Sequence, residues 1–178
     1  MITELHDRQN NSIEKTMNEE AGYVDNPRLI DQPTNFGITQ PTLDKYNQKH
    51  PTLNFPKKVI DIKREHAKQI YKEDYYDGRK IWEIKNPRIA HAVFDMGVMS
   101  NFNNVIKTVQ KTLNNFQRAN LIVDGKMGNK TIGALNSVPD DKINEFMNLL
   151  KRNRIKYLRS LSDWGKFGRG WVSRTNRY

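Results

Sequence analysis

Apolar side chains recur at helical spacing through most of this sequence. Between residues 8 and 21, Ile13 and Met17 lie three or four residues apart on one stripe with Glu20. Gly22 follows at the position expected for a helix C-cap. The next stretch changes character: prolines, Asn and Asp turn formers and Gly37 predict an irregular loop or a small β-hairpin.

Helical signals then return and continue to the end of the chain. Further helices are predicted to begin at the cap Thr39-Gln40-Pro41 and near Asp61, and to cover residues 87–98, 103–116, 132–135 and the stretch from Pro139 to Leu161. The segment 87–98 is nearly all apolar and is predicted to be the most buried helix. The pattern therefore predicts a mainly α fold with one hairpin or loop region after the first helix.

Length and composition narrow the class of protein. A chain of 178 residues with 36% hydrophobic residues is long enough for one domain, or for one domain with a small appended lobe. It contains no cysteine, which excludes disulfides, thiolate zinc sites and cysteine nucleophiles. No run of eighteen apolar residues predicts a transmembrane segment, and the N-terminal residues lack the apolar core of a signal peptide. We expect synthesis in a bacterial cytoplasm without a signal peptide.

The net charge of +10 is unevenly distributed. From Lys151 to Tyr178, nine Lys and Arg residues face one acid, Asp163, so this segment carries +8 and the first 150 residues carry only +2. Such a basic segment attracts polyanions: nucleic acid, anionic lipid or the carboxylate-bearing bacterial wall. The alternative is an ordinary solvated helix face. No helix-turn-helix, RNP motif or zinc finger accompanies the charge, so specific nucleic-acid binding is not expected.

Glu20 is the acid whose position most strongly indicates chemistry. A carboxyl group on an apolar stripe at a helix C-terminus is partly desolvated and faces the negative end of the helix dipole. Both effects raise its pKa, as a glycosidase general acid requires. The alternative is a glutamate that reaches solvent or pairs with an arginine. A second group would come from Asp25, Asp31 or the Thr34 hydroxyl, each of which is equally suited to form a turn.

No motif predicts a cofactor or a metal. The four histidines show no HxxxH or HxH spacing, and His91, within the apolar segment, is expected to be a core histidine. GxxxxGK[ST], GxGxxG and GxSxG are all missing from the sequence. Acid–base chemistry without metal or cofactor remains.

Four blocks of this sequence resemble motifs of the glycoside hydrolase family 108 lysozymes, and they occur in the same order along the chain. EAGYVDNPRLIDQPTNFGIT is similar to the family signature E-G-G-Y-x-x-x-P-x-D-P-G-G-x-T-x-x-G-I-T. The matching residues are Glu20, Gly22, Tyr23, Pro27, Thr34, Gly37, Ile38 and Thr39. IAHAVFDMGV resembles the family's apolar F-D helix, VDGKMGNKTIGALN its peptidoglycan-binding segment, and FGRGWVSR its closing G-x-G-W-x-x-R.

This resemblance implies a lysozyme-like α+β fold, with a catalytic segment over residues 1–100 and a helical peptidoglycan-binding segment over 101–178. It implies a muramidase, most simply a phage endolysin, that acts as a monomer on peptidoglycan in the periplasm or wall after release. It makes Glu20 the catalytic acid. The substrate contacts that it suggests are Tyr23, Asn35, Gly37 and Asp95. The basic C-terminal segment would then attract the enzyme to the anionic envelope.

Two departures from the family pattern keep alternatives open. The family's D-P-G-G is here Leu29-Ile30-Asp31-Gln32, so Asp31 or Thr34 must take over the second role, or activity is reduced. The usual V-N-S-G is Val98-Met99-Ser100-Asn101. A wall-binding or virion structural protein that has lost efficient chemistry is the alternative function. The segment 123–136 is equally compatible with a structural lobe and with glycan binding.

Overall fold

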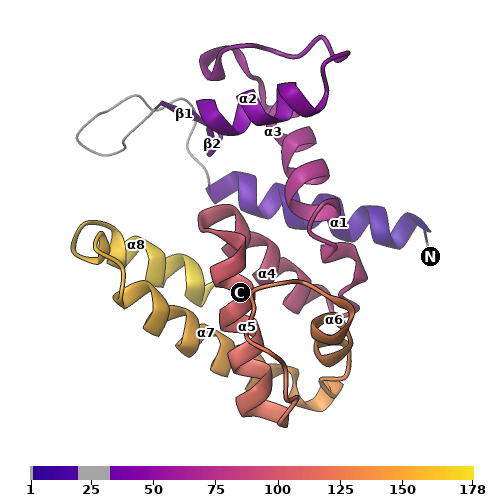
Figure 1. Ribbon diagram of the computed structural model, residues 1–178, viewed down its shortest axis with the longest axis vertical. Coiled ribbons are helices and arrows are strands. Elements are labelled where there is room, and N and C mark those ends of the chain that lie inside the picture. Colours follow the sequence, from indigo (N-terminus) through magenta and orange to yellow (C-terminus); the bar gives the residue numbers. More distant parts are fainter. Residues whose placement is uncertain (1, 20–32) are drawn as a thin grey trace. The chain divides into compact units, whose positions relative to one another are not determined.

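The computed structural model describes residues 2–19 and 33–178 (Figure 1). The chain divides into two compact units, Met1–Arg79 and Lys80–Tyr178. The fold is mainly helical with one small antiparallel hairpin, which confirms the predicted fold class.

The first unit begins with helix α1 (Ile2–Glu19). The helix starts earlier than the predicted residue 8, whereas its stripe is as predicted: Ile13 and Met17 are 0% and 1% exposed. A hairpin of β1 (Thr34–Asn35) and β2 (Ile38–Thr39) precedes α2 (Gln40–Lys49). Thr39 caps α2 as predicted, because its hydroxyl oxygen accepts a hydrogen bond from the Thr42 amide at 3.3 Å.

The second half of this unit differs from the single long helix predicted to begin near Asp61. A 3-10 turn η1 (Val59–Asp61) comes first, followed by α3 (Arg64–Ile70) and by a π-helical segment η2 (Tyr71–Asp77). A π turn inserts a residue into the helical ladder and changes which side chains share a face. The periodicity of the sequence does not predict this change, because contacts from other elements stabilise the inserted turn.

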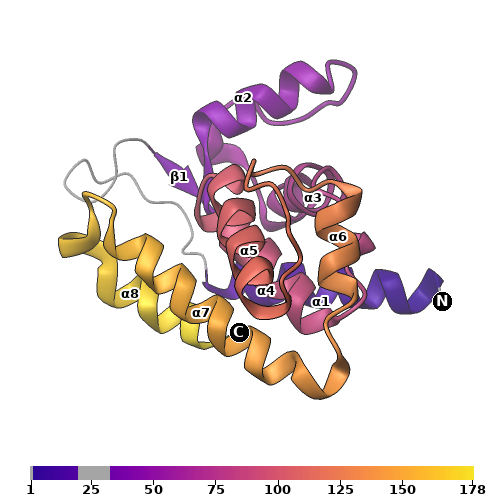
Figure 2. The ribbon, with the colours of Figure 1, turned by 60° about the horizontal axis from the view of Figure 1, so that its bottom comes forward.

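The second unit contains most of the helices. After η3 (Ile81–Glu83), the helices are α4 (Pro87–Met99), α5 (Phe102–Gln117), α6 (Asn129–Asn136), α7 (Ile143–Arg159) and α8 (Trp164–Asn176), with η4 (Asp140–Lys142) before α7. Helices α5 and α7 pack against each other, as do α7 and α8, and both ribbon views show α7 and α8 side by side (Figures 1 and 2).

The apolar segment 87–98 forms α4, and eight consecutive or nearly consecutive residues of this helix are buried, as predicted. Asn86 caps it by accepting hydrogen bonds from the next amides, and Pro87 occupies its first turn. At its end, a Cβ on Gly97 would come within 2.8 Å of the Phe102 ring. Glycine at this position therefore allows α5 to start close against α4.

Helix α8 is not among the predicted helices. Gly165, Gly168 and Gly170 give its sequence a low helix propensity. A Cβ on Gly168 would lie 2.7 Å from the ring of Trp164, one turn earlier in the same helix, so glycine makes room for this ring. The packing of α8 against α7 offsets the unfavourable local sequence.

Candidate functional site

The hairpin of the first unit presents three of the predicted site residues. Thr34 pairs with Thr39 and Asn35 with Ile38, so the loop consists of Phe36 and Gly37. Both loop residues have positive φ, 50° and 74°, the arrangement of a type I′ turn, which matches the twist of the two strands. Glycine adopts a positive φ without strain, and this conformational requirement explains the glycine at residue 37.

Asn35 anchors the hairpin from the inside. Its side chain is 5% exposed, and Nδ2 donates to the carbonyl oxygens of Val59 and Ile62, each at 3.1 Å. These bonds tie the hairpin to η1 and to Ile62, the residue that follows it. The described contacts of Asn35 are therefore structural; its contact with substrate stays a prediction.

Thr34 differs from Asn35 in its hydrogen bonding. It is half-buried at the start of β1, and its hydroxyl has no hydrogen-bond partner within the described residues. The hairpin around it is fixed on the other side, because the Tyr71 hydroxyl donates to the Phe36 carbonyl oxygen at 2.7 Å. Thr34 therefore presents an unused hydroxyl on a rigid support, which is what holding a water molecule requires.

The remaining residues of the predicted catalytic motif, Glu20, Tyr23, Asp25 and Asp31, lie outside the described residues, as does the predicted C-cap Gly22. Their roles stay predictions.

The other acids of α1 have no arrangement suited to proton donation. Glu19, the last residue of the helix, is exposed. Glu14 accepts hydrogen bonds from Arg64 at 2.7 Å and from Lys68 at 2.9 Å. These bonds, the one from Arg64 first, lower the pKa of Glu14, and this carboxylate stays ionised.

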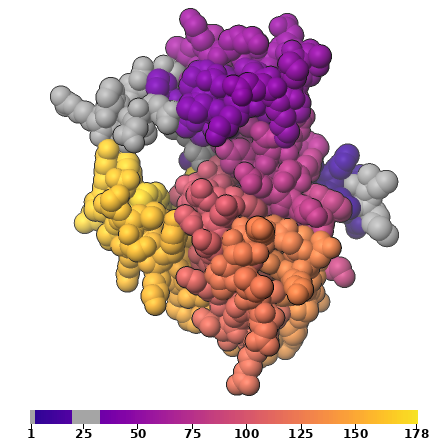
Figure 3. Space-filling model, in the orientation of Figure 1, coloured from indigo at the N-terminus to yellow at the C-terminus, as the bar shows by residue number. Residues whose placement is uncertain are grey.

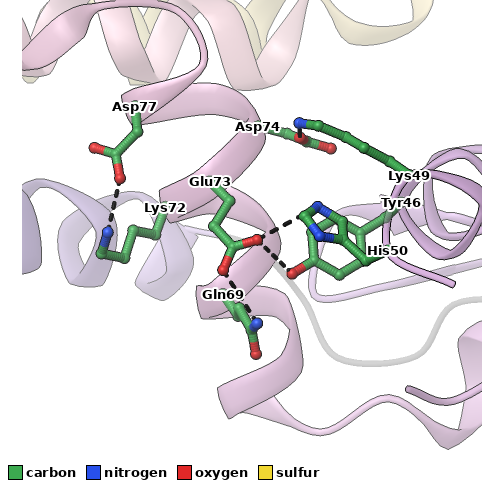
Figure 4. A network of polar contacts seen from close by, with 8 residues as sticks. All are labelled: Tyr46, Lys49, His50, Gln69, Lys72, Glu73, Asp74 and Asp77. Carbon is green, nitrogen blue, oxygen red and sulfur yellow. Dashed lines mark hydrogen bonds and ion pairs between the residues drawn. The ribbon is translucent and has the colours of Figure 1, made fainter. Parts of the chain in front are cut away.

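A second carboxylate cluster surrounds Glu73 on the π-helical segment (Figure 4). Tyr46 of α2 donates to Oε2 at 2.7 Å, Gln69 donates to Oε1 at 3.1 Å, and His50 lies 3.5 Å from Oε2. Burial, followed by the hydrogen bond to Glu73, raises the pKa of Tyr46, which keeps the phenol protonated as the donor. No local sequence pattern indicates this cluster, because Tyr46 and Glu73 are 27 residues apart in the chain.

Asp95 lies in the second unit, inside its core. Its side chain is 3% exposed; it accepts from Arg174 Nη2 at 2.7 Å and Nε at 3.0 Å, and from the Tyr178 hydroxyl at 2.8 Å. Burial and the neighbouring carboxylate raise the pKa of Tyr178, so that the phenol remains a donor. The described contacts make Asp95 one half of a buried bidentate ion pair between α4 and α8. A role in substrate binding stays a prediction.

The segment VDGKMGNKT is tied to α5 by one buried amide. Gln110, 2% exposed, accepts from the Gly125 amide at 2.9 Å and donates to Asp124 at 2.8 Å and to Thr131 at 3.2 Å. Gly125 has φ of 78°, and a Cβ there would lie 2.7 Å from the Asn103 carbonyl oxygen. The polar residues of this motif thus form internal hydrogen bonds that shape the turn.

The basic C-terminal segment contains fewer surface charges than its composition indicates. Arg154 is 1% exposed and donates to the Ser100 hydroxyl, and Arg174 is neutralised by Asp95. Lys151 is half-buried and donates to the Asn176 carbonyl oxygen at 3.2 Å. Lys151 therefore lies against the end of α8, whereas Arg152 and Lys156 are exposed.

Within the described part of the chain, no three His, Asp or Glu side chains form a group that would hold a metal ion. No helix of the described residues is long and apolar enough to span a membrane.

Comparison with known proteins places these features in a family. The glycosyl hydrolase 108 family matches residues 13–100, and the predicted peptidoglycan domain matches residues 104–176. A solved structure, that of Brucella abortus SagA, is similar with a TM-score of 0.76 and 26% sequence identity, over 95% of this chain and 90% of that one. No curated protein matches the sequence.

The two matches divide the chain after α4, and together they include every helix from the second half of α1 to α8. The division of function into residues 1–100 and 101–178 stays a prediction. Since the first match spans α1, the hairpin and α4 in one alignment, and the second the bundle of α5 to α8, the chain belongs to the glycosyl hydrolase 108 family and is a peptidoglycan hydrolase of the glycoside hydrolase class.

Proposed function

We propose that this protein is an N-acetylmuramidase, which hydrolyses the β-1,4 bond between N-acetylmuramic acid and N-acetylglucosamine. The observation that carries the proposal is the match to the family over residues 13–100, together with the family's signature glutamate at position 20. In this mechanism Glu20 is the general acid, protonating the glycosidic oxygen as the bond breaks.

The hairpin supports the second half of the mechanism. Its type I′ turn, the Asn35 anchor and the bond from Tyr71 hold Thr34 in place, and the Thr34 hydroxyl has no described partner. A hydroxyl so positioned orients a water molecule toward the sugar carbon, while Asp31 is the nearest acid in sequence to the family's missing aspartate.

Product analysis tests the bond that is cut. Digestion of purified peptidoglycan followed by mass spectrometry is expected to give products that end in reducing N-acetylmuramic acid. Reducing N-acetylglucosamine would indicate a glucosaminidase, and anhydro ends a lytic transglycosylase; either result would overturn the proposed bond. A folded protein that binds sacculi and releases no product would support the alternative, a wall-binding or virion structural protein, which the changed segment Leu29-Ile30-Asp31-Gln32 favours.

Paired variants separate the two candidates for the second group. If Asp31 holds the water, Asp31→Asn is expected to lower turnover at least about tenfold and Thr34→Val to have a mild effect. If Thr34 holds it, the order reverses. Reducing-end release from soluble glycan measures turnover, and thermal unfolding checks that each variant folds. If both variants cleave at equal, near-native rates, Asp25 becomes the candidate that holds the water.

We also propose that the exposed cations of the C-terminal segment draw this enzyme, as a phage endolysin and monomer, to the anionic envelope. Exposed attraction is screened within about 8 Å at physiological ionic strength. Lysis of permeabilised cells is therefore expected to fall as salt rises, while cleavage of a short soluble glycan changes little. Reversing the exposed Arg152 and Arg169 to Glu should mimic high salt. Salt-independent lysis would assign these charges no role in targeting.

A further inference from the structure

A groove of about 440 Å³ lies between α5 and α7 in the second unit. The lining residues that matter here are Asn104, Lys107 and Lys111 from α5, and Asn153, Lys156 and Tyr157 from α7. This volume is within the range of about 300–1,000 Å³ that is typical of ligand sites. Residues spaced three and four apart share a helix face, so the two helices each contribute one continuous polar stripe.

The charges of this groove are all of one sign. Lys107, Lys111 and Lys156 are exposed, and no acidic residue lines the groove with them. Elsewhere in the described chain, lysines such as Lys49, Lys68 and Lys72 pair with carboxylates. The three groove lysines form no ion pair with any described residue. Lys107 and Lys111 lie four residues apart on one helix, where like charges repel each other weakly, and an anionic ligand would relieve this repulsion.

The walls between the lysines are fixed and carry amide and hydroxyl groups. Asn104 Nδ2 donates to the Tyr157 hydroxyl at 3.0 Å across the groove, and Asn153 Nδ2 donates to Thr112 at 2.9 Å. The side-chain nitrogen of each amide donates to the protein, whereas no described donor binds the side-chain oxygen Oδ1 of Asn104, so this oxygen can accept from a ligand N–H. The site therefore combines ammonium groups for carboxylates with acceptors for amide N–H.

The polar side chains of the segment VDGKMGNKT, in the same unit, are not available to a ligand in this way. Gln110 donates to both Asp124 and Thr131, so these side chains already form hydrogen bonds within the turn. Figure 3 shows the surface of α5 and of the segment leading to α6 on one face. The α5–α7 groove, by contrast, combines a hollow with three exposed lysines that have no described ion-pair partner.

We propose that the α5–α7 groove binds the peptide stem of peptidoglycan through its free carboxylates. This inference rests on the proposed function for the choice of polymer: the sugar backbone is neutral, whereas the stem carries both several carboxylates and a row of amide N–H groups. Binding there would hold the wall while the first unit cuts the glycan.

The test is an NMR titration of the full chain with a synthetic stem tetrapeptide that contains diaminopimelate and has free carboxylates. Amide shifts are expected in residues 104–115 and 153–160. Lys107→Gln/Lys111→Gln/Lys156→Gln is expected to weaken binding at least about tenfold at low ionic strength. The matched control is Lys126→Gln/Lys130→Gln/Lys166→Gln, which removes the same charge from exposed positions outside the groove and should bind like the native protein.

Three further ligands make the result decisive. The fully amidated tetrapeptide and N-acetylglucosamine tetramer should bind at least about tenfold more weakly than the acidic stem. Equal binding by either of them, shifts elsewhere in the chain, or tighter binding of random duplex DNA to the same residues would overturn the proposal. Hydrolysis of stem-free glycan strands tests the catalytic proposal separately: the groove variant should cleave them at the native rate, and failure of the native protein to cleave them would leave the titration result standing.

Discussion

Replacing Glu20 with glutamine is expected to lower the rate of peptidoglycan cleavage by about two or more orders of magnitude, while the protein remains folded. The amide keeps the shape of the side chain and removes the proton that the leaving oxygen must receive. Because a general acid acts in the transition state, the loss should appear in kcat rather than in the affinity for sacculi.

Two neighbouring acids provide matched controls for this variant. Glu19→Gln alters an exposed residue at the end of α1 and should leave the rate nearly unchanged. Glu14→Gln removes the acceptor of Arg64 and Lys68, so it should lower the melting temperature slightly and leave kcat unchanged. Near-native clearing of permeabilised cells by folded Glu20→Gln protein would contradict the central assignment.

Breaking the pair between Asp95 and Arg174 is expected to cause the largest loss of stability in the second unit. The two side chains are 3% and 10% exposed, and removing either charge leaves the other buried without its partner. Such losses amount to about 3–5 kcal/mol in the free energy of unfolding. Asp95→Asn and Arg174→Met should both show them in denaturant titrations.

The double variant separates the pair from its surroundings. Asp95→Asn/Arg174→Met is expected to be less destabilised than the sum of the two single variants, because no unpaired charge remains. Tyr178→Phe removes one hydrogen bond to Asp95 and should cost only about 1 kcal/mol. Single variants within about 0.5 kcal/mol of the native protein would show that the pair contributes little to the stability of the fold.

Local patterning was enough to predict most helices of this protein. The apolar stripe of Ile13 and Met17, the cap at Thr39 and the buried segment 87–98 each depend on neighbours within one or two turns, and each appears as predicted. The glycine at position 37 and its turn-forming neighbours predicted an irregular loop or a small hairpin, and the structure has the hairpin, whose two-residue type I′ loop has a local conformational requirement. Sequence motifs also identified the family, which the comparison confirms.

Features that depend on distant partners were decided by the tertiary structure. The π turn at Tyr71–Asp77 and the glycine-containing helix α8 contradict local propensity and are held by packing. Asp95 and Asn35 were predicted as substrate contacts from motifs, whereas their described partners lie 79 residues and more than 20 residues away in the chain.

Dependence on distant partners also explains why the sequence did not predict the buried charges of the basic segment or the α5–α7 groove. Counting charges could not show that Arg154 and Arg174 are buried, because burial depends on α4 and α8 packing against their neighbours. The lysines of α5 and α7 are about 45 residues apart in sequence and form one site only because the two helices pack together. The sequence alone thus determined most of the helices, the turn region and the family of this protein. Tertiary packing decided which charges are buried in ion pairs and which remain available to bind a ligand, because long-range burial sets the cost of an unpaired charge.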